Sequence, residues 1–389
     1  MAQPAPFFYH PVVRIALATS LLVTSFAMYA PVIAVTLQQR GYSTLVIGAF
    51  AMIGFACIGV LMPFLPTLCA RFGEVQVYRV GAVFWFVAGL GYASTSSLLI
   101  WCVAAVVGGL GGAAVWNATE ALIARYSPAD RRGRITGLYQ TLLGGALAVG
   151  PFVPAVFGID GQQTLYAVCG VQAAALVLII NQPPLPKTPT GANPTEDGFA
   201  LSTWQALAQV PGLALIAFVG GVFEAGLGSI SAAHGAALGM SMAAATSVVG
   251  ALGIGSFVCQ YPAGILADHA PPARVFGMAA TLLMASSLSV AFSDTAPWVL
   301  WACAFVWGGV GGALYTLTMI RVAHQFTGQN TAAGTAAMIT GYTLGGAIGP
   351  VVSGYALVAF KAPGLSAWLT SLSLLVLFLA ARWKPPKMV

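Results

Sequence analysis

Long apolar runs, separated by short polar segments, extend along nearly the whole chain. Each run holds about 20 residues, the length that an α-helix needs to cross the hydrocarbon core of a bilayer. The pattern predicts an all-α membrane protein with twelve transmembrane helices, at residues 12–37, 45–69, 77–97, 99–124, 134–158, 163–181, 204–230, 238–266, 273–293, 297–322, 331–359 and 364–382.

One polar segment, between the sixth and seventh runs, is longer than the others. It contains two acidic residues, Glu196 and Asp197, and a series of prolines, Pro183, Pro184, Pro186, Pro189 and Pro194. Polar, proline-rich composition is typical of a linker. We therefore expect an N-terminal bundle at 1–182, a linker at 183–203 and a C-terminal bundle at 204–389.

A glycine cluster in the fourth run recurs in the tenth. Residues 108–113 read Gly-Gly-Leu-Gly-Gly-Ala, and residues 308–313 read Gly-Gly-Val-Gly-Gly-Ala. Trp101 and Trp301 precede the two copies at the same offset. Close helix packing explains one such cluster but not its recurrence in register. Because the period is far longer than a solenoid repeat, we expect two pseudo-symmetric six-helix bundles.

Composition supports a membrane protein. Hydrophobic residues make up 59% of the chain and charged residues 6%, whereas a soluble domain has about 25% charged residues. The net charge of +6 is therefore interpreted through its position beside the membrane, not as a sign of nucleic-acid binding. The six cysteines lack disulfide or metal-site spacing. The first apolar run is too long for a signal peptide.

Basic residues indicate the orientation, since cytoplasmic loops carry an excess of Lys and Arg. A cytoplasmic N-terminus leaves only Arg40 and Lys361 outside. It places thirteen on the cytoplasmic side: Arg14, Arg71, Arg79, Arg125, Arg131, Arg132, Arg134, Lys187, Arg274, Arg321, Arg382, Lys384 and Lys387. We expect a monomer in the cell inner membrane with both termini in the cytoplasm.

Four segments beside or within the runs carry recognisable motifs. Residues 264–269 read Gly-Ile-Leu-Ala-Asp-His, followed by Arg274, and residues 66–73 form a degraded copy with Ala70 where the first has Asp268. Residues 127–134 read Ser-Pro-Ala-Asp-Arg-Arg-Gly-Arg, and residues 145–151 read Gly-Ala-Leu-Ala-Val-Gly-Pro.

Together these segments resemble the loop and helix motifs of the major facilitator superfamily of secondary transporters. The resemblance covers nearly the whole chain and implies two six-helix halves, built from inverted three-helix repeats, around a central site reached alternately from either side. The 145–151 segment is similar to the motif of the family's exporters and antiporters, with Ala146 in place of its leading Gly.

The resemblance also implies conformational-switch residues: Asp268, Arg134, Gly264, Gly150 and Pro151. We expect Asp268 to lie against the start of the fifth helix near Arg134, where a helix start carries free N–H groups and partial positive charge. Because Ala70 replaces the first-half Asp, this latch should be one-sided.

Three ionisable residues lie within the predicted spans, namely Glu120, Glu224 and, near a helix end, Arg321. Each costs roughly 2.5–3.5 kcal/mol on insertion scales and marks a functional site by default. Apolar surroundings favour the protonated form of a carboxyl group, so Glu224 is a candidate for proton coupling or substrate binding. The alternative is a structural Glu224 with hydrogen-bond partners.

When the first copy of the repeat is aligned with the second, Glu120 falls next to the position of Arg321. The two residues therefore lie at nearly equal depth in the membrane. In the family they would face each other across the central cavity, and their pairing could close its cytoplasmic mouth. Alternatively, Glu120 pairs with Arg125 or Arg132, or acts as a direct substrate or proton site. Arg321 could simply extend to the interface.

Several polar and aromatic residues are candidates for the cavity lining: Asn117, Tyr29, Trp116 and Tyr315. The alternative for an aromatic residue in a helical bundle is plain packing. Four scattered histidines make no metal site.

No nucleotide-binding or hydrolytic motif is present, so we expect neither an enzyme nor a cofactor, and an ion gradient rather than ATP as the energy source. The sequence favours proton-coupled export of a small organic solute. The alternatives are proton-coupled uptake of an organic acid, siderophore or similar nutrient, and a sensor or enzyme on a transporter-like scaffold. No extramembrane piece is long enough for the last.

Overall fold

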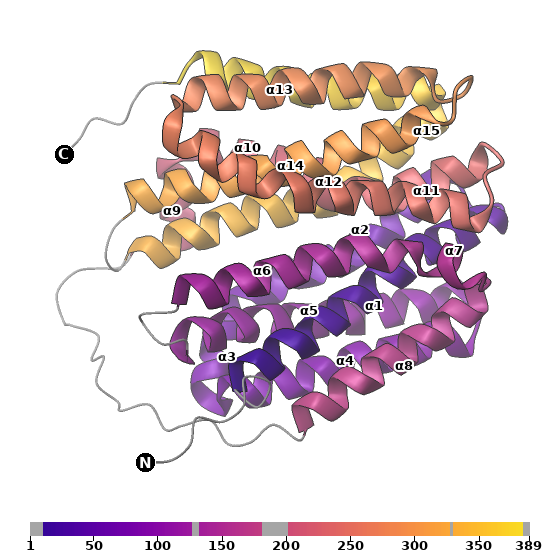
Figure 1. Ribbon diagram of the computed structural model, residues 1–389, viewed down its shortest axis with the longest axis horizontal. Helices are drawn as coiled ribbons and strands as arrows, with labels where there is room; N and C mark the ends of the chain where they lie inside the picture. The colour runs from indigo at the N-terminus through magenta and orange to yellow at the C-terminus, as the bar shows by residue number, and fades with distance from the viewer. Residues whose placement is uncertain (1–10, 127–131, 181–200, 327–329, 384–389) are drawn as a thin grey trace.

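The computed structural model describes residues 11–126, 132–180, 201–326 and 330–383, and they form a bundle of long, roughly parallel helices (Figure 1). The first half contributes eight helical segments: α1 (Pro11–Gln39), α2 (Thr44–Leu61), α3 (Leu65–Phe72), α4 (Glu74–Ser94), α5 (Leu98–Tyr126), α6 (Arg132–Val149), α7 (Val153–Phe157) and α8 (Gly161–Ile180).

The second half contributes seven segments: α9 (Thr203–Gln209), α10 (Pro211–Gly221), α11 (Leu227–Ala237), α12 (Met242–His269), α13 (Pro272–Ser289), α14 (Val299–Gln325) and α15 (Thr331–Ala381). We call the end of the bundle at which α1 begins and α15 finishes the terminal end, on the left in Figure 1, and the opposite end the far end.

The twelve predicted crossings are present in the described part of the chain. Ten helices are long and apolar enough to cross a membrane, and Leu142–Phe157 is a shorter apolar helix. The longest, α15, is two helices joined at Lys361, where the backbone leaves the helical conformation with φ 55° and ψ −153°. Counting α15 twice and the shorter helix once gives twelve, so the predicted all-α architecture is confirmed.

The boundaries of the seventh crossing differ from the prediction of 204–230. Residues 203–209 form the separate helix α9, and the crossing itself runs from Pro211 to Ala237. Pro211 has no backbone N–H to donate and occupies the first turn of a new helix. At the other end, Gly239 adopts φ 85° in the turn before α12, a conformation that glycine tolerates.

The repeat in the sequence is a repeat in space. In the first half α5 packs against α2 and α4, and in the second half α14 packs against α12 and α13. A side chain at Gly109 would come within 2.7 Å of the Gly54 carbonyl oxygen on α2, and one at Gly309 within 3.0 Å of the Gly255 carbonyl oxygen on α12. Both glycine clusters therefore allow equivalent close approaches of two helices.

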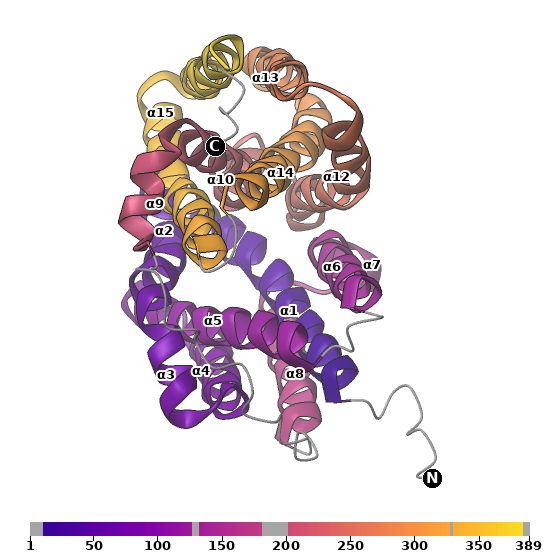
Figure 2. The ribbon, with the colours of Figure 1, turned by 90° about the vertical axis from the view of Figure 1, so that its left-hand side faces the viewer.

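The main contacts between the two halves join α2 with α15, α1 with α11, and α6 with α12. Figure 2 shows the first pair and the last pair on opposite sides of the boundary. Near the far end, Thr44 Oγ1 donates a hydrogen bond to the Gly354 carbonyl at 2.9 Å. Gly48 has no room for a side chain because the Pro350 carbonyl lies against it. These contacts hold the far ends of the halves together.

The predicted linker at 183–203 falls almost wholly outside the described residues, so the division into domains at that point stays a prediction. The basic residues do divide between the two ends. Arg40 and Lys361 lie at the far end, in the turn after α1 and in the bend of α15, whereas Arg71, Arg274 and Arg382 lie at the terminal end.

Candidate transport site

Glu224 lies where the seventh crossing departs from regular α-helix. Residues Val222–Gly226 form a π-helical segment between α10 and α11. Such a segment inserts one extra residue into a turn, and it occurs often at functional sites. The sequence permits it because Gly221 and Gly226 flank the acid and let α15 approach the widened turn closely.

Two hydroxyl groups from other helices hold the Glu224 carboxyl. Ser256 Oγ on α12 donates to Glu224 Oε1 at 2.5 Å, and the Tyr342 hydroxyl on α15 donates to Oε2 at 2.9 Å. No cation pairs with this carboxyl among the described residues. Since hydroxyl groups can donate or accept, this arrangement can hold the carboxyl in either protonation state.

The hydrogen bonds continue from Glu224 to a more open position. Gln260 Nε2 donates to Ser256 Oγ at 3.4 Å, and Thr316 Oγ1 donates to Gln260 Oε1 at 2.9 Å. Ser256 is only 3% exposed, whereas Gln260 is exposed. Polar groups therefore connect the buried carboxyl with an exposed side chain on α12.

The glycine cluster of α14 makes room for this carboxyl. A side chain at Gly312 would have its Cβ 2.5 Å from Glu224 Oε1, so only glycine fits without moving the acid. The equivalent first-half residue, Gly112, has as its nearest neighbour an atom of the Trp85 ring at 4.0 Å. The two copies of the cluster thus share helix packing, but only the second borders an acidic group.

Glu120 is exposed on α5, and its partner is one turn earlier on the same helix. Trp116 Nε1 donates to Glu120 Oε1 at 2.8 Å. Among the described side chains, Glu120 is therefore held within its own helix in this conformation.

Tyr315 of α14 packs against Tyr342, one of the hydrogen-bond partners of Glu224. Its ring lies 4.6 Å, centroid to centroid, from the ring of Tyr342, at an interplanar angle of 46°. The pair is partly exposed and offers an aromatic surface beside the Glu224 carboxyl.

Arg321 and Glu120 do not contact each other in this conformation. Arg321 Nη2 donates to the Ala267 carbonyl on α12 at 2.9 Å, and no ion pair joins it to Glu120 in the part of the chain that the structure describes. Their pairing across the cavity in another conformation stays a prediction.

Asn117 and Tyr29 make contacts within the first half. Asn117 Oδ1 lies 3.7 Å from Cys69 Sγ, and its Nδ2 lies 3.9 Å from Met62 Sδ. Tyr29 is 8% exposed and stacks with Tyr92 at 5.0 Å between centroids. Both residues pack between helices here, and their roles in substrate binding stay predictions.

Among the predicted switch residues, Gly150 and Pro151 lie in a tight turn, Gly150–Phe152, that interrupts the fifth crossing. A side chain at Gly150 would come within 2.5 Å of Ala27 Cβ on α1. Gly264 lies in α12, with open space where a side chain would be. The side chains of Asp268 and Arg134 are outside the described residues, so the latch stays a prediction.

Reasoning from the sequence missed Ser256, Gln260, Thr316 and Tyr342. Gln260 carried a signal, because it is the large amide in an otherwise apolar run at 238–266. Tyr342 is flanked by Gly341 and Gly345, which allow α15 to approach α10 closely. Ser256 and Thr316 had no distinguishing signal, since small hydroxyl residues occur throughout the chain.

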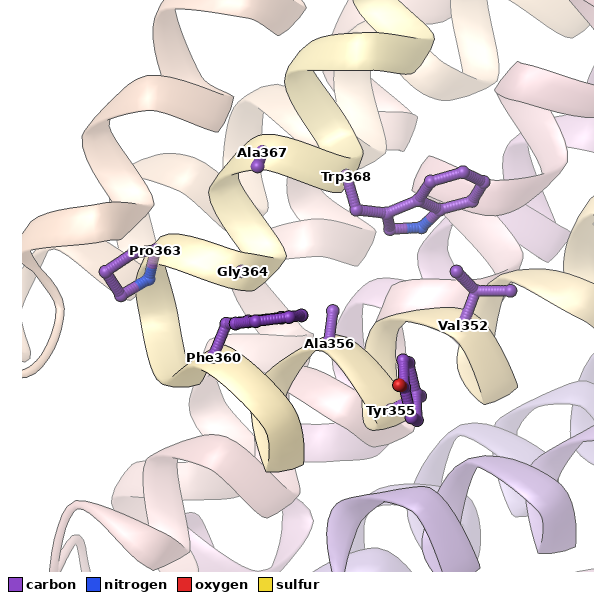
Figure 3. A pocket seen from close by; sticks show the side chains of 8 residues that line it. All are labelled: Val352, Tyr355, Ala356, Phe360, Pro363, Gly364, Ala367 and Trp368. Atoms are coloured by element: carbon purple, nitrogen blue, oxygen red, sulfur yellow. The ribbon is translucent and has the colours of Figure 1, made fainter.

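Two cavities lie beside the bend of α15. The first is an apolar groove between the two arms of α15, seen in Figure 3, with the rings of Tyr355 and Phe360 below and Trp368 above. The second has a mixed lining of polar and apolar residues: Gln38, Ser43, Thr44, His234, Ala237, Leu238, Asp294, Leu357, Val358 and Lys361. In the described chain, no group of three or more His, Cys, Asp or Glu side chains is placed to hold a metal ion.

Comparison with known proteins identifies the family. The sequence profile of the Major Facilitator Superfamily matches residues 15–235 and again residues 213–388. The chain is 25% identical over 380 residues to the uncharacterized MFS-type transporter YfkF of Bacillus subtilis (strain 168), with 95% of this chain and 94% of YfkF covered. It is 27% identical over 222 residues to the uncharacterized transporter YebQ of Escherichia coli (strain K12), covering 56% and 47%.

Solved structures share the fold. The nucleoside transporter NupG superposes with a TM-score of 0.78 at 11% identity, covering 96% of this chain and 100% of NupG. A bacterial homolog of the human lysosomal transporter Spinster, in an inward-facing and unoccupied conformation, gives 0.70 at 15% identity, covering 99% and 100%. At such identities the likeness concerns the fold alone. The profile match over both halves establishes that the chain belongs to the Major Facilitator Superfamily and is a multi-pass membrane transporter.

Proposed function

We propose that this protein exports a small organic solute across the cell inner membrane in exchange for protons, with Glu224 as the proton-coupling residue. The observation that supports the proposal is the Glu224 carboxyl, which has hydroxyl partners on two other helices and no cation among the described residues. Burying a charge without a cation is costly, so a proton or a cationic solute can compete for this position.

Alternation between the two sides follows from the position of the contacts between the halves. The halves are joined near the far end, through Thr44 and Gly354 among others, whereas Glu120 and Arg321 are apart. With the terminal end in the cytoplasm, as the basic residues predict, this arrangement supports an inward-open conformation. Pairing of Glu120 with Arg321 would then close the cytoplasmic mouth as the far end opens.

The direction of transport is proposed as export because residues 145–151 resemble the motif of exporters and antiporters. In this structure, Gly150 of that segment lies against Ala27 of α1, so the motif brings the fifth crossing close to the first. Uptake by symport is the competing outcome. In that case the same pH gradient, acidic outside, would drive the solute into the cell instead of out of it.

The experiment has two stages. A thermal-shift screen of candidate solutes at two pH values identifies a ligand, because a molecule that binds the native state raises the apparent stability. That solute is then offered to inverted membrane vesicles with and without an acidic interior. Antiport predicts accumulation that needs the gradient. Accumulation only in right-side-out vesicles with an acidic exterior would instead establish symport and contradict export.

A further inference from the structure

The cavity at the far end that Lys361 and Asp294 help to line, which we call the junction cavity, lies between the two halves. Gln38, Ser43 and Thr44 of the first half form one side, and residues of the second half, including Asp294 and Lys361, form the other. Its volume is ≈ 500 Å³, within the range of about 300–1,000 Å³ that is usual for small-molecule sites. The cavity is separate from the Glu224 network, which lies within the bundle.

Opposite charges line this cavity without contacting each other. The ammonium group of Lys361 and the carboxylate of Asp294 are both exposed, and they form no ion pair in the part of the chain that the structure describes. Lys361 is held in the bend of α15 with φ 55°, a conformation that is uncommon outside glycine. The bend therefore brings the Lys361 side chain into the cavity lining.

A third polar group in the lining lacks a partner. Gln38 Oε1 is buried and accepts no hydrogen bond from the protein, although buried polar atoms are nearly always hydrogen-bonded. By contrast, Thr44 is committed to the Gly354 carbonyl, and His234 Nε2 lies 2.9 Å from Ser293 Oγ. The lining thus offers one exposed cation and one exposed anion, and the Gln38 acceptor can meet a ligand only after its side chain turns.

We propose that the junction cavity binds a small zwitterion, with its carboxylate at Lys361 and its ammonium group at Asp294. A lone cation would leave Lys361 without a partner, and a lone anion would leave Asp294 without one. A molecule carrying both charges satisfies the two groups together. The apolar groove on the other side of the bend (Figure 3) has no charged lining residue and does not match such a ligand.

Binding at this position should affect conformation. Because both halves contribute to the lining, the cavity exists only while the far ends are together, and its ligand favours that conformation. A zwitterion outside the cell is therefore expected to slow transport without entering the central site. The inference concerns binding at the far end and does not depend on the solute or the coupling ion of the central site.

The test uses the full-length protein in lipid nanodiscs at pH 7.5. Thermal unfolding is followed with glycine, 4-aminobutyrate and 6-aminohexanoate, in which the two charges are progressively farther apart. Hexylamine and hexanoate are matched probes with one charge each. At least one zwitterion should raise the melting temperature in a saturable manner, and neither singly charged probe should reproduce the shift at the same concentration.

Variants then locate the site. Asp294→Asn and Lys361→Met should each weaken the binding of that zwitterion by at least roughly tenfold. Asp160→Asn removes an exposed acid from the same end of the bundle and outside the cavity lining, and it should leave binding unchanged. The wild-type series is decisive by itself, since the absence of a shift with all three zwitterions overturns the proposal. A shift that persists in both cavity variants also overturns it.

Discussion

Glu224 and Glu120 are both acids in apolar helices, yet their surroundings differ. The oxygens of Glu224 are held by Ser256 and Tyr342 from two other helices. Glu120 has Trp116, on its own helix, as its hydrogen-bond donor. A carboxyl held from two sides keeps its position while it exchanges a proton, whereas one held within its own helix can change partner when helices move. The structure therefore supports different proposed roles for the two acids.

The space around Glu224 leads to a prediction with a matched control. Gly312→Ala places a methyl group against Glu224 Oε1, whereas Gly112→Ala, the equivalent change in the first half, meets nothing closer than 4.0 Å. Overpacking of this kind costs about 1–3 kcal/mol. Gly312→Ala should lower the melting temperature and impair transport, and Gly112→Ala should be close to wild type in both. Equal melting temperatures and equal transport in the two variants would contradict the close packing of Gly312 against Glu224.

The sequence identified Glu224 but not its partners, and the reason is physical. A charged residue in an apolar run is rare because it is costly, so it stands out without any structure. Ser256 and Tyr342 are uncharged and lie 32 and 118 positions from Glu224, so only the packing of α12 and α15 brings them together. Tyr29, which is predicted for the cavity lining, packs against Tyr92 in this conformation, and its role in substrate binding stays a prediction.

At the scale of helices, apolar runs predict the crossings well and their interruptions poorly. The break between α9 and α10 was missed although Pro211 marks it, because apolar residues continue across the break. The π-helical turn at Val222–Gly226 has no sequence period of its own. The interval between the last two predicted runs, residues 360–363, did contain the bend of α15 at Lys361.

The contact between α2 and α15 can be tested with a pair of variants on α2. Gly48→Ala forces a methyl group against the Pro350 carbonyl, whereas Gly54 has open space where its side chain would be. We expect Gly48→Ala to cost about 1–3 kcal/mol in the free energy of unfolding through overpacking, and Gly54→Ala to be neutral or slightly stabilising. Thermal unfolding measures both. Equal stability of the two variants would mean that α2 and α15 are not closely packed at this point.

Charge reversal tests the proposed gate, which is the pairing of Glu120 on α5 with Arg321 on α14. Glu120→Arg and Arg321→Glu should each impair transport, because each places like charges at the mouth that has to close. The double reversal should recover part of the activity, since it restores an opposite-charge pair. Flux measured in vesicles decides the matter. A double variant as inactive as the worse single one indicates that the residues act separately, and Glu120 then becomes a direct substrate or proton site.

The whole molecule combines a symmetric scaffold with an asymmetric distribution of chemistry. Gly109 and Gly309 serve equivalent helix contacts in the two halves, and the duplication could be read directly from the sequence. The acidic network occurs in the second half alone among the described residues, around Glu224. Such asymmetry suits a transporter in which one half carries the coupling group and the other moves around it.

The most direct measurement is transport by Glu224→Gln, which keeps the shape of the side chain and removes its titration. Purified wild-type and variant proteins are compared in proteoliposomes, with solute accumulation driven by a pH gradient measured beside solute exchange without a gradient. The account predicts that the variant loses driven accumulation, down to the level seen without a gradient, while it retains exchange. Driven accumulation at the wild-type level in Glu224→Gln would contradict the assignment of Glu224 as the coupling residue.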